Sequence, residues 1–255
     1  MFRLIWLCFL NLGIFALAIC VLAGCRSPAE QNYSLVNWNT TKMLTLIWGQ
    51  ECTDATAEFI PNAYKMGSSG VCRVFDSEVT CGGHFPPDLN LAQAVLEDID
   101  KFNSTDAVIQ KCRETIDKPV NHSTAKKIGI AMACVIFLSM ILGIVSTIVA
   151  VKTDEPWGLG TSAVLVCDAL TIFVALVLLV AIMNYEGGGY LKEVHAREYS
   201  DREMIGIGLW MLLGMFIARM LSNPWVLAGV ITILVPIFLA VGFVLIRFRG
   251  FMMFM

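Results

Sequence analysis

Four cysteines lie in the long polar stretch of the chain, and their chemistry could be that of disulfides or of a metal site. They are Cys52, Cys72, Cys81 and Cys112. A zinc knuckle usually has paired cysteines two to four residues apart, and Cys72 and Cys81 are not spaced in this way, although His84 follows them. An even set of cysteines suits an oxidising compartment. We therefore predict disulfides and no metal.

The segment VCRVFDSEVTC is typical of a β-hairpin, because two strand-like runs flank the short turn Asp76-Ser77. Closing a two-residue turn pairs Phe75 with Glu78, and the same register sets Cys72 opposite Cys81. Alternation makes the cysteines a non-hydrogen-bonded pair with Cα atoms about 4.5 Å apart, which a disulfide tolerates. Cys52 and Cys112 then pair by elimination. Cys25 stays unassigned as free, acylated or a competitor for one of those pairs.

The composition indicates a membrane protein. The chain has 255 residues, of which 57% are hydrophobic and 15% charged, whereas a soluble domain carries about 25% charged residues. The net charge of −3 is spread over scattered basic and acidic residues, which argues against a nucleic-acid partner. The predicted surroundings of the chain are therefore a lipid bilayer.

The polar stretch lies between apolar runs that are long enough to cross a bilayer core of about 30 Å as helices. The predicted spans are 1–24, 126–151, 158–183 and 204–246. The last is either one span with a surface segment before it or a helical hairpin of 204–221 and 225–246, because Asn223-Pro224 favours a break. The first is an uncleaved anchor by its length, although VLAGC, ending at Cys25, is similar to a lipoprotein cleavage box.

These spans predict a mainly α membrane fold, a bundle of four or five helices. A small disulfide-bonded α+β domain of residues 25–125 follows the first span. Strands are expected at 32–38 and 42–48, before helices at 91–102 and 104–116. The remaining predicted segments are a short loop at 152–157, a second loop at 184–203 and a tail at 247–255.

N-glycosylation sequons give the orientation. All of the sequons in the chain lie in the polar stretch, at Asn32, Asn39, Asn103 and Asn121. Glycans and disulfides both indicate that residues 25–125 are extracellular. Arg3 and Lys152 then fall on the cytosolic side, as the positive-inside rule expects. We therefore predict a multi-pass plasma-membrane protein with a large outer loop.

Two charged residues fall inside predicted spans, where an unpaired charge is costly. Asp168 lies about ten residues into the third span, and Arg219 lies near the cytosolic end of the next apolar segment. Both are therefore near the same membrane face and could form an ion pair. In the alternative, Arg219 reaches the headgroups and Asp168 is protonated or bonded to a neighbouring helix. A conducting role would need more than one carboxylate.

Catalytic signatures are absent from the sequence. It contains no G-x-S-x-G, no H-E-x-x-H and no P-loop. We therefore predict that the protein is not an enzyme and needs no cofactor.

The layout of the chain resembles the claudin-like four-span membrane proteins, which have a large sheet-containing outer loop between their first two spans. Within that superfamily, GSSGVC followed by a second cysteine is most similar to the pattern of the fungal mating-induced calcium-regulator and membrane-fusion family. Gly67, Gly70, Cys72 and Cys81 match the pattern. Ser68 and Ser69 stand where that family tends to have hydrophobic residues.

The resemblance implies a plasma-membrane protein that assists calcium influx or cell fusion during fungal mating. It also implies association with copies of itself or with other membrane proteins. Two alternatives remain from the sequence: a tetraspanin-like scaffold or adhesion protein, and a small-ion channel or transporter subunit that uses Asp168. Tetraspanins carry their large loop between the last two spans, with a Cys-Cys-Gly motif that this loop lacks.

The number of spans sets the side of the C-terminus, which a glycosylation tag can report. With four spans the C-terminus is cytosolic, and an acceptor sequon appended after Met255 should stay unmodified while the native loop sequons are glycosylated. The measurement is a gel shift that enzymatic deglycosylation reverses. Modification of the tag would contradict the four-span topology.

Overall fold

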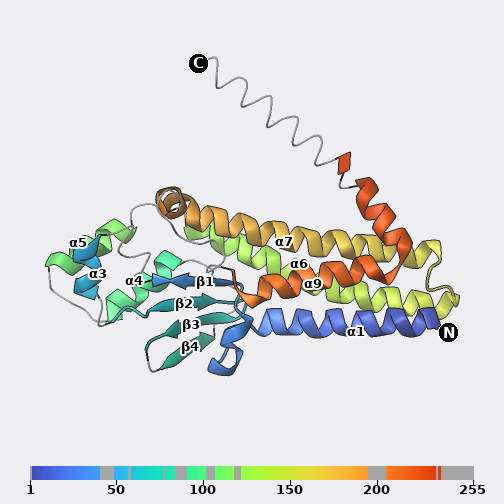
Figure 1. The fold of residues 1–255 in the computed structure, drawn as a ribbon, viewed down its shortest axis with the longest axis horizontal. Coiled ribbons are helices and arrows are strands. Elements are labelled where there is room, and N and C mark those ends of the chain that lie inside the picture. The colour runs from blue at the N-terminus through green and yellow to red at the C-terminus, as the bar shows by residue number, and fades with distance from the viewer. Residues whose placement is uncertain are drawn as a thin grey trace, which may run out of the picture.

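The computed structural model has a long helical bundle with a small sheet domain at one end, opposite the N-terminus (Figure 1). It describes residues 2–40, 49–56, 59–76, 78–83, 91–101, 107–117, 122–194, 205–233 and 235–236. Two predicted features fall outside these ranges, the strand at 42–48 and the tail at 247–255, and they stay predictions.

Four helices form the bundle. They are α1 (Phe2–Ala23), α6 (His122–Thr153), α7 (Leu159–Val194) and α9 (Ile207–Ser222). The helices α1 and α7 each contact both α6 and α9, so the four form a closed ring. In the described part of the chain, three helices are long and apolar enough to cross a membrane, and a bent pair that begins with α9 would be a fourth.

The outer faces of the bundle helices are apolar. Large hydrophobic side chains are exposed on each of them, for example Phe9 (67%), Ile141 (56%), Val177 (49%) and Ile217 (50%). Such continuous apolar exposure is uncommon on soluble proteins, and it is compatible with a multi-pass membrane protein.

The third predicted span is longer than expected. α7 continues to Val194, so the first part of the predicted loop 184–203 is helical, and residues 195–203 are outside the described ranges. The helical part of the predicted loop includes the three glycines of EGGGY. A glycine costs only about 1 kcal/mol in a helix interior, which a helix already hydrogen-bonded over many residues can tolerate.

The break at Asn223-Pro224 is confirmed, and it is a sharp one. α9 ends at Ser222, and the next helix, Pro224–Ile233, runs at 115° to it. Asn223 is extended (φ −160°, ψ 131°), as the residue before a proline prefers, and its Oδ1 accepts a hydrogen bond from Trp225 N at 2.9 Å.

α9 lies within the bundle, with Leu212, Met215 and Arg219 buried. The segment thus packs as one of the bundle helices, and the number of spans in this part of the chain stays a prediction.

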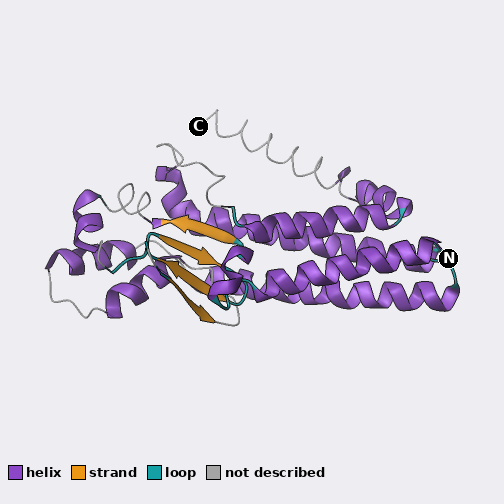
Figure 2. Ribbon diagram, turned by 60° about the horizontal axis from the view of Figure 1, so that its bottom comes forward, coloured by secondary structure: helices purple, strands orange, loops and turns teal. Residues whose placement is uncertain are grey.

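The sheet domain lies between α1 and α6 in the sequence. It consists of the antiparallel strands β1 (Val36–Asn39), β2 (Ala63–Met66), β3 (Gly70–Val74) and β4 (Val79–Gly83), in that spatial order. A short 3₁₀ helix, η1 (Pro28–Tyr33), precedes the sheet, and the helices α3 (Gln50–Thr56), α4 (Leu91–Lys101) and α5 (Ala107–Asp117) complete the domain. Figure 2 shows the four strands beside the end of the bundle.

The hairpin of β3 and β4 has the predicted register. Cys72 faces Cys81 and Val74 faces Val79, and Phe75 N donates to Glu78 O at 2.8 Å. The sequence did not indicate β2, whose AYKM run is short, nor the helix α3.

The turn between β2 and β3, with the sequence GSSG, packs on the C-terminal end of α1. Ser68 Oγ donates to Val21 O, and Ser69 Oγ donates to Leu22 O. These carbonyl groups belong to the last helical turn, where the regular helical donors run out, and Val21 O also accepts a hydrogen bond from Gly24 N at 3.3 Å. The serines therefore cap α1 from a segment more than 40 residues away in the sequence.

The glycines of the turn allow this close approach. A Cβ on Gly67 would overlap the carbonyl group of Gly24, and a Cβ on Gly70 would overlap the carbonyl oxygens of Cys25 and Gly82. The turn fits against α1 because these two positions have no side chain.

A second junction joins the sheet to α9. Gly208 N donates to Ser34 O at 2.8 Å, and Gly206 N donates to Leu35 O at 3.1 Å. The buried hydrophobic core is continuous across both junctions, from Ala18 and Val21 of α1 to Trp38 and Tyr64 of the sheet. The sheet domain and the bundle therefore share one core.

The packing of the turn predicts that Gly70→Ala destabilises the protein, because its methyl group would overlap two carbonyl oxygens. Overpacking of this kind costs about 1–3 kcal/mol, and thermal unfolding of the detergent-solubilised protein should show a lower Tm. Gly82→Ala is the matched control, since its Cβ would have Arg73 Nη1 as its nearest neighbour at 3.9 Å. Equal Tm values for the two variants would contradict the close packing.

Candidate functional site

An ion pair between Asp168 and Arg219 lies at the centre of the bundle. Asp168 is on α7 and Arg219 on α9, and both side chains are completely buried. Arg219 Nη2 contacts Asp168 Oδ2. Of the predicted arrangements the structure has the ion pair, and the guanidinium group is buried against Asp168 and does not reach the headgroups.

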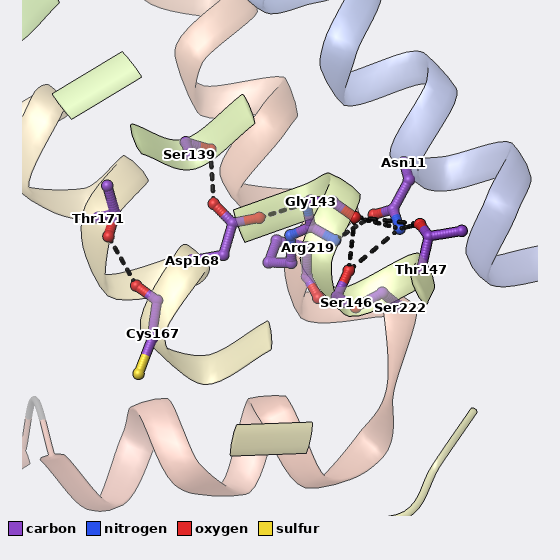
Figure 3. Close-up of polar contacts among 10 residues, drawn as sticks. All are labelled: Asn11, Ser139, Gly143, Ser146, Thr147, Cys167, Asp168, Thr171, Arg219 and Ser222. Carbon is purple, nitrogen blue, oxygen red and sulfur yellow. Dashed lines mark hydrogen bonds and ion pairs between the residues drawn. The ribbon is translucent and has the colours of Figure 1, made fainter. Parts of the chain in front are cut away.

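The remaining two helices complete a polar layer around the pair (Figure 3). From α6, Ser139 Oγ donates to Asp168 Oδ1 at 2.5 Å. From α1, Asn11 Oδ1 accepts a hydrogen bond from Arg219 Nη1. One connected set of hydrogen bonds and an ion pair therefore links all four helices.

The amide group of Asn11 also binds α6. Asn11 Nδ2 donates to Thr147 Oγ1 at 2.6 Å, and it lies 3.2 Å from both Gly143 O and Ser146 Oγ. Its carbonyl and amino groups thus face different helices, so this one side chain joins α9 to α6.

Gly143 makes room for the ion pair. A Cβ at this position would lie 3.4 Å from Arg219 Nη2 and 4.0 Å from Asp168 Oδ2. Gly143 and Ser146 thus border the polar layer.

The polar layer separates two apolar clusters in the bundle. On the side of the sheet domain, Ile14, Ile136 and Ile172 belong to the larger core. On the other side, Leu7, Ala150 and Leu165 belong to a second cluster, with Val226 and Val230 of the Pro224–Ile233 helix. Arg219 and Asp168 are therefore held between hydrophobic layers, where water competes little for them.

The negative charge of Asp168 is neutralised by the positive charge of Arg219. The carboxylate has one cation and one hydroxyl donor as partners, so it is not a free anion that could bind a passing cation. Among the residues that the structure describes, Arg219 Nε lacks a hydrogen-bond acceptor.

Sequence reasoning missed the roles of Asn11 and Ser139. Asn11 does carry a signal, because a polar side chain inside a membrane helix indicates an interhelical partner. Ser139 carries no such signal, because serine can bond to its own helix.

The structure contains both predicted disulfides. Cys72–Cys81 joins β3 to β4 with a Cα–Cα distance of 4.0 Å, and Cys52–Cys112 joins α3 to α5 at 5.7 Å. Cys25 is a free and fully buried thiol, and burial raises its pKa to about 12. It is therefore poorly reactive and does not compete for either disulfide in the structure.

A buried ionic cluster fixes α4 to the sheet. Asp98 accepts hydrogen bonds from Tyr64 Oη at 2.7 Å, from Arg73 Nε at 2.5 Å and from Lys101 Nζ at 2.7 Å. Burial and the neighbouring Asp98 carboxylate raise the pKa of Tyr64. Asp98 is only 4% exposed, so this residue of the acidic run EDID makes a packed contact with the sheet.

Two of the predicted glycosylation sites are described by the structure. Asn32 lies on η1 with its side chain exposed, and Asn39 ends β1. Asn103 and Asn121 lie outside the described residues. Within those residues, no group of three or more His, Cys, Asp or Glu side chains could hold a metal ion.

The fold and the site define a mainly helical protein with disulfides, apolar membrane-compatible helices and a polar layer inside the bundle. In comparisons with known proteins, no family model, curated protein or solved structure matches the chain.

Removing one member of the buried ion pair should destabilise the bundle. Arg219→Met leaves the Asp168 carboxylate without its cation, and the loss should be about 3–5 kcal/mol, whereas the double variant Asp168→Leu with Arg219→Met should recover most of it. Denaturant unfolding of the solubilised protein measures both. Cys167→Ala, at the exposed neighbour of Asp168 on α7, is the control. Additive losses in the double variant would contradict coupling between the two charges.

Proposed function

We propose that the protein is a claudin-like plasma-membrane protein that assists calcium influx and membrane or cell fusion during fungal mating. The observation that carries the proposal is that the four residues of the resemblance form one structural unit. Gly67 and Gly70 allow the GSSG turn to pack on α1, and Cys72–Cys81 joins the two strands that follow. The motif thus serves to hold a sheet against the bundle.

The departure from the family pattern has a physical explanation that supports the proposal. Ser68 and Ser69 replace hydrophobic residues, and both donate hydrogen bonds to the end of α1. A turn with this role can be polar, since its side chains meet carbonyl groups. The serines therefore do not count against the resemblance.

The disulfides and sequons of the sheet domain support an extracellular position for it. Both disulfides lie in this domain, together with the sequon residues Asn32 and Asn39. Disulfides persist in oxidising compartments, and N-glycans are added to loops of secreted or surface proteins. The sheet domain is then the surface that a partner outside the cell would meet.

The polar layer favours association over conduction as the mode of action. Arg219 neutralises Asp168, and apolar clusters lie on both sides of the pair. The proposed role is to assist a calcium-influx or fusion machinery as a homo-oligomer or as a subunit beside other membrane proteins. The alternative of a scaffold or adhesion protein shares this mode of action, and the channel alternative does not.

The proposal predicts that opening the β3–β4 disulfide abolishes function without preventing delivery to the surface. In cells that depend on this chain, Cys72→Ser with Cys81→Ser should remove calcium uptake and cell fusion at an unchanged surface level, because the strands lose their covalent register. Radioactive calcium uptake, fusion counts and surface biotinylation measure the three quantities. Cys167→Ser, a free and exposed cysteine of α7, is the control and should leave all three unchanged.

Two experimental outcomes would contradict the proposal and favour one of the alternatives. Normal uptake and fusion in the double cysteine variant would favour a scaffold that acts in another process. A changed selectivity between calcium and sodium on Asp168→Asn, with surface level and sheet domain intact, would favour the channel alternative.

A further inference from the structure

A cavity of about 650 Å³ lies at the end of the bundle opposite the sheet domain, between the start of α1 and the turn that joins α6 to α7. It is lined by Phe2, Arg3 and the turn residues 154–158. Its volume is within the range of about 300–1,000 Å³ that is typical of small-molecule sites. Figure 1 shows the two segments together at the N-terminal end of the bundle.

Charged side chains of both signs border the cavity without neutralising each other. Arg3, Asp154 and Glu155 are exposed, and the ion pairs of the described residues involve other side chains. The guanidinium group of Arg3 lies over the ring of Trp157, with Cζ 4.2 Å from the ring centroid. This cation–π contact holds the positive charge at one wall. The cavity thus offers one positive and two negative groups to an occupant.

The turn that carries the two acidic residues is held by its own hydrogen bonds. Gly158 N donates to Glu155 O at 2.9 Å, and Thr161 Oγ1 donates to the same oxygen at 3.2 Å. Asp154 has a left-handed backbone (φ 51°), a conformation that Asp and Asn adopt more readily than most residues. The backbone under both carboxylates is therefore preformed, which lowers the entropic cost of binding.

The cavity lies where the apolar parts of the helices begin and end. These parts start at Phe2 and Leu159 and end at Thr153, so in a bilayer that the helices cross, the cavity is at the level of the lipid headgroups. The ring of Phe2 lines the cavity and is 79% exposed. A lipid can therefore place its headgroup in the cavity while its acyl chains contact Phe2 and the apolar outer face of α1.

We propose that the cavity binds the headgroup of phosphatidylethanolamine. Arg3 contacts the phosphate group, and Asp154 and Glu155 contact the primary ammonium group, whose three N–H donors suit carboxylate acceptors. Phosphatidylcholine has the same phosphate group, but its trimethylammonium group has no N–H to donate. An anionic lipid without an amine would leave both carboxylates unpaired next to a negative headgroup. The site goes beyond the proposed function, since it requires neither calcium influx nor fusion.

Native mass spectrometry of the full-length, delipidated protein tests the site, with phosphatidylethanolamine and phosphatidylcholine of identical acyl chains added in equal amounts. We expect about two- to tenfold more bound phosphatidylethanolamine, the range that one or two partly exposed charge pairs supply. Asp154→Asn with Glu155→Gln should remove this preference, and Asn preserves the left-handed turn. Glu51→Gln with Asp54→Asn removes the same charge on α3, outside the cavity wall, and should keep the preference.

A further variant and a competitor separate the two ends of the lipid. Arg3→Gln should weaken the binding of both lipids by a similar factor, because both carry the phosphate group. Glycerophosphoethanolamine, which has the headgroup without the acyl chains, should not displace the lipid at equal concentration. Equal binding of the two lipids to the unmodified protein, or a preference that survives in the double acidic variant, would overturn the proposal. Displacement by the chain-free headgroup would overturn the assignment to a lipid.

Discussion

The ion pair between Asp168 and Arg219 is the constraint on which the arrangement of the bundle depends. Neither charge is tolerable in an apolar core without the other, so α7 and α9 must meet at these residues. Ser139 of α6 and Asn11 of α1 each add one further hydrogen bond to the pair. Each helix contributes a polar group at one level, which fixes the rotation and the axial position of all four. Apolar packing alone specifies such a register weakly, because many rotations of a hydrophobic helix bury similar surfaces.

The sheet domain depends on the same helices through their other ends. The GSSG turn covers the last carbonyl groups of α1, and the backbone of Ser34 and Leu35 accepts bonds from the start of α9. α1 and α9 are also the helices that Asn11 and Arg219 join inside the bundle. The two helices are therefore connected at two levels, once in the polar layer and once through the sheet.

Much of this fold follows from patterns in the sequence, and the exceptions have physical reasons. The hairpin register could be predicted because a two-residue turn and strand alternation leave one pairing for Cys72 and Cys81. The pairing of Asp168 with Arg219 could be considered because charges are rare in apolar spans. The capping of α1 by Ser68 and Ser69 could not, since a long-range contact leaves no periodic signal. α7 passes its predicted end because adjacent glycines weaken a helix without stopping it. The partners of Asn11 could not be predicted, because they depend on how each helix is rotated about its own axis.

The docking of the sheet on α1 also determines the orientation of the sheet domain relative to the bundle. The domain is bonded to the end of α1 through backbone carbonyl groups, and to α9 through the two residues before its first strand. It therefore has little freedom to tilt against the bundle. Its surface keeps a constant angle to the helix axes, so a partner meets one orientation and loses less conformational entropy when it binds. Two glycines without side chains, and the serines between them, thus set the direction in which the whole domain faces.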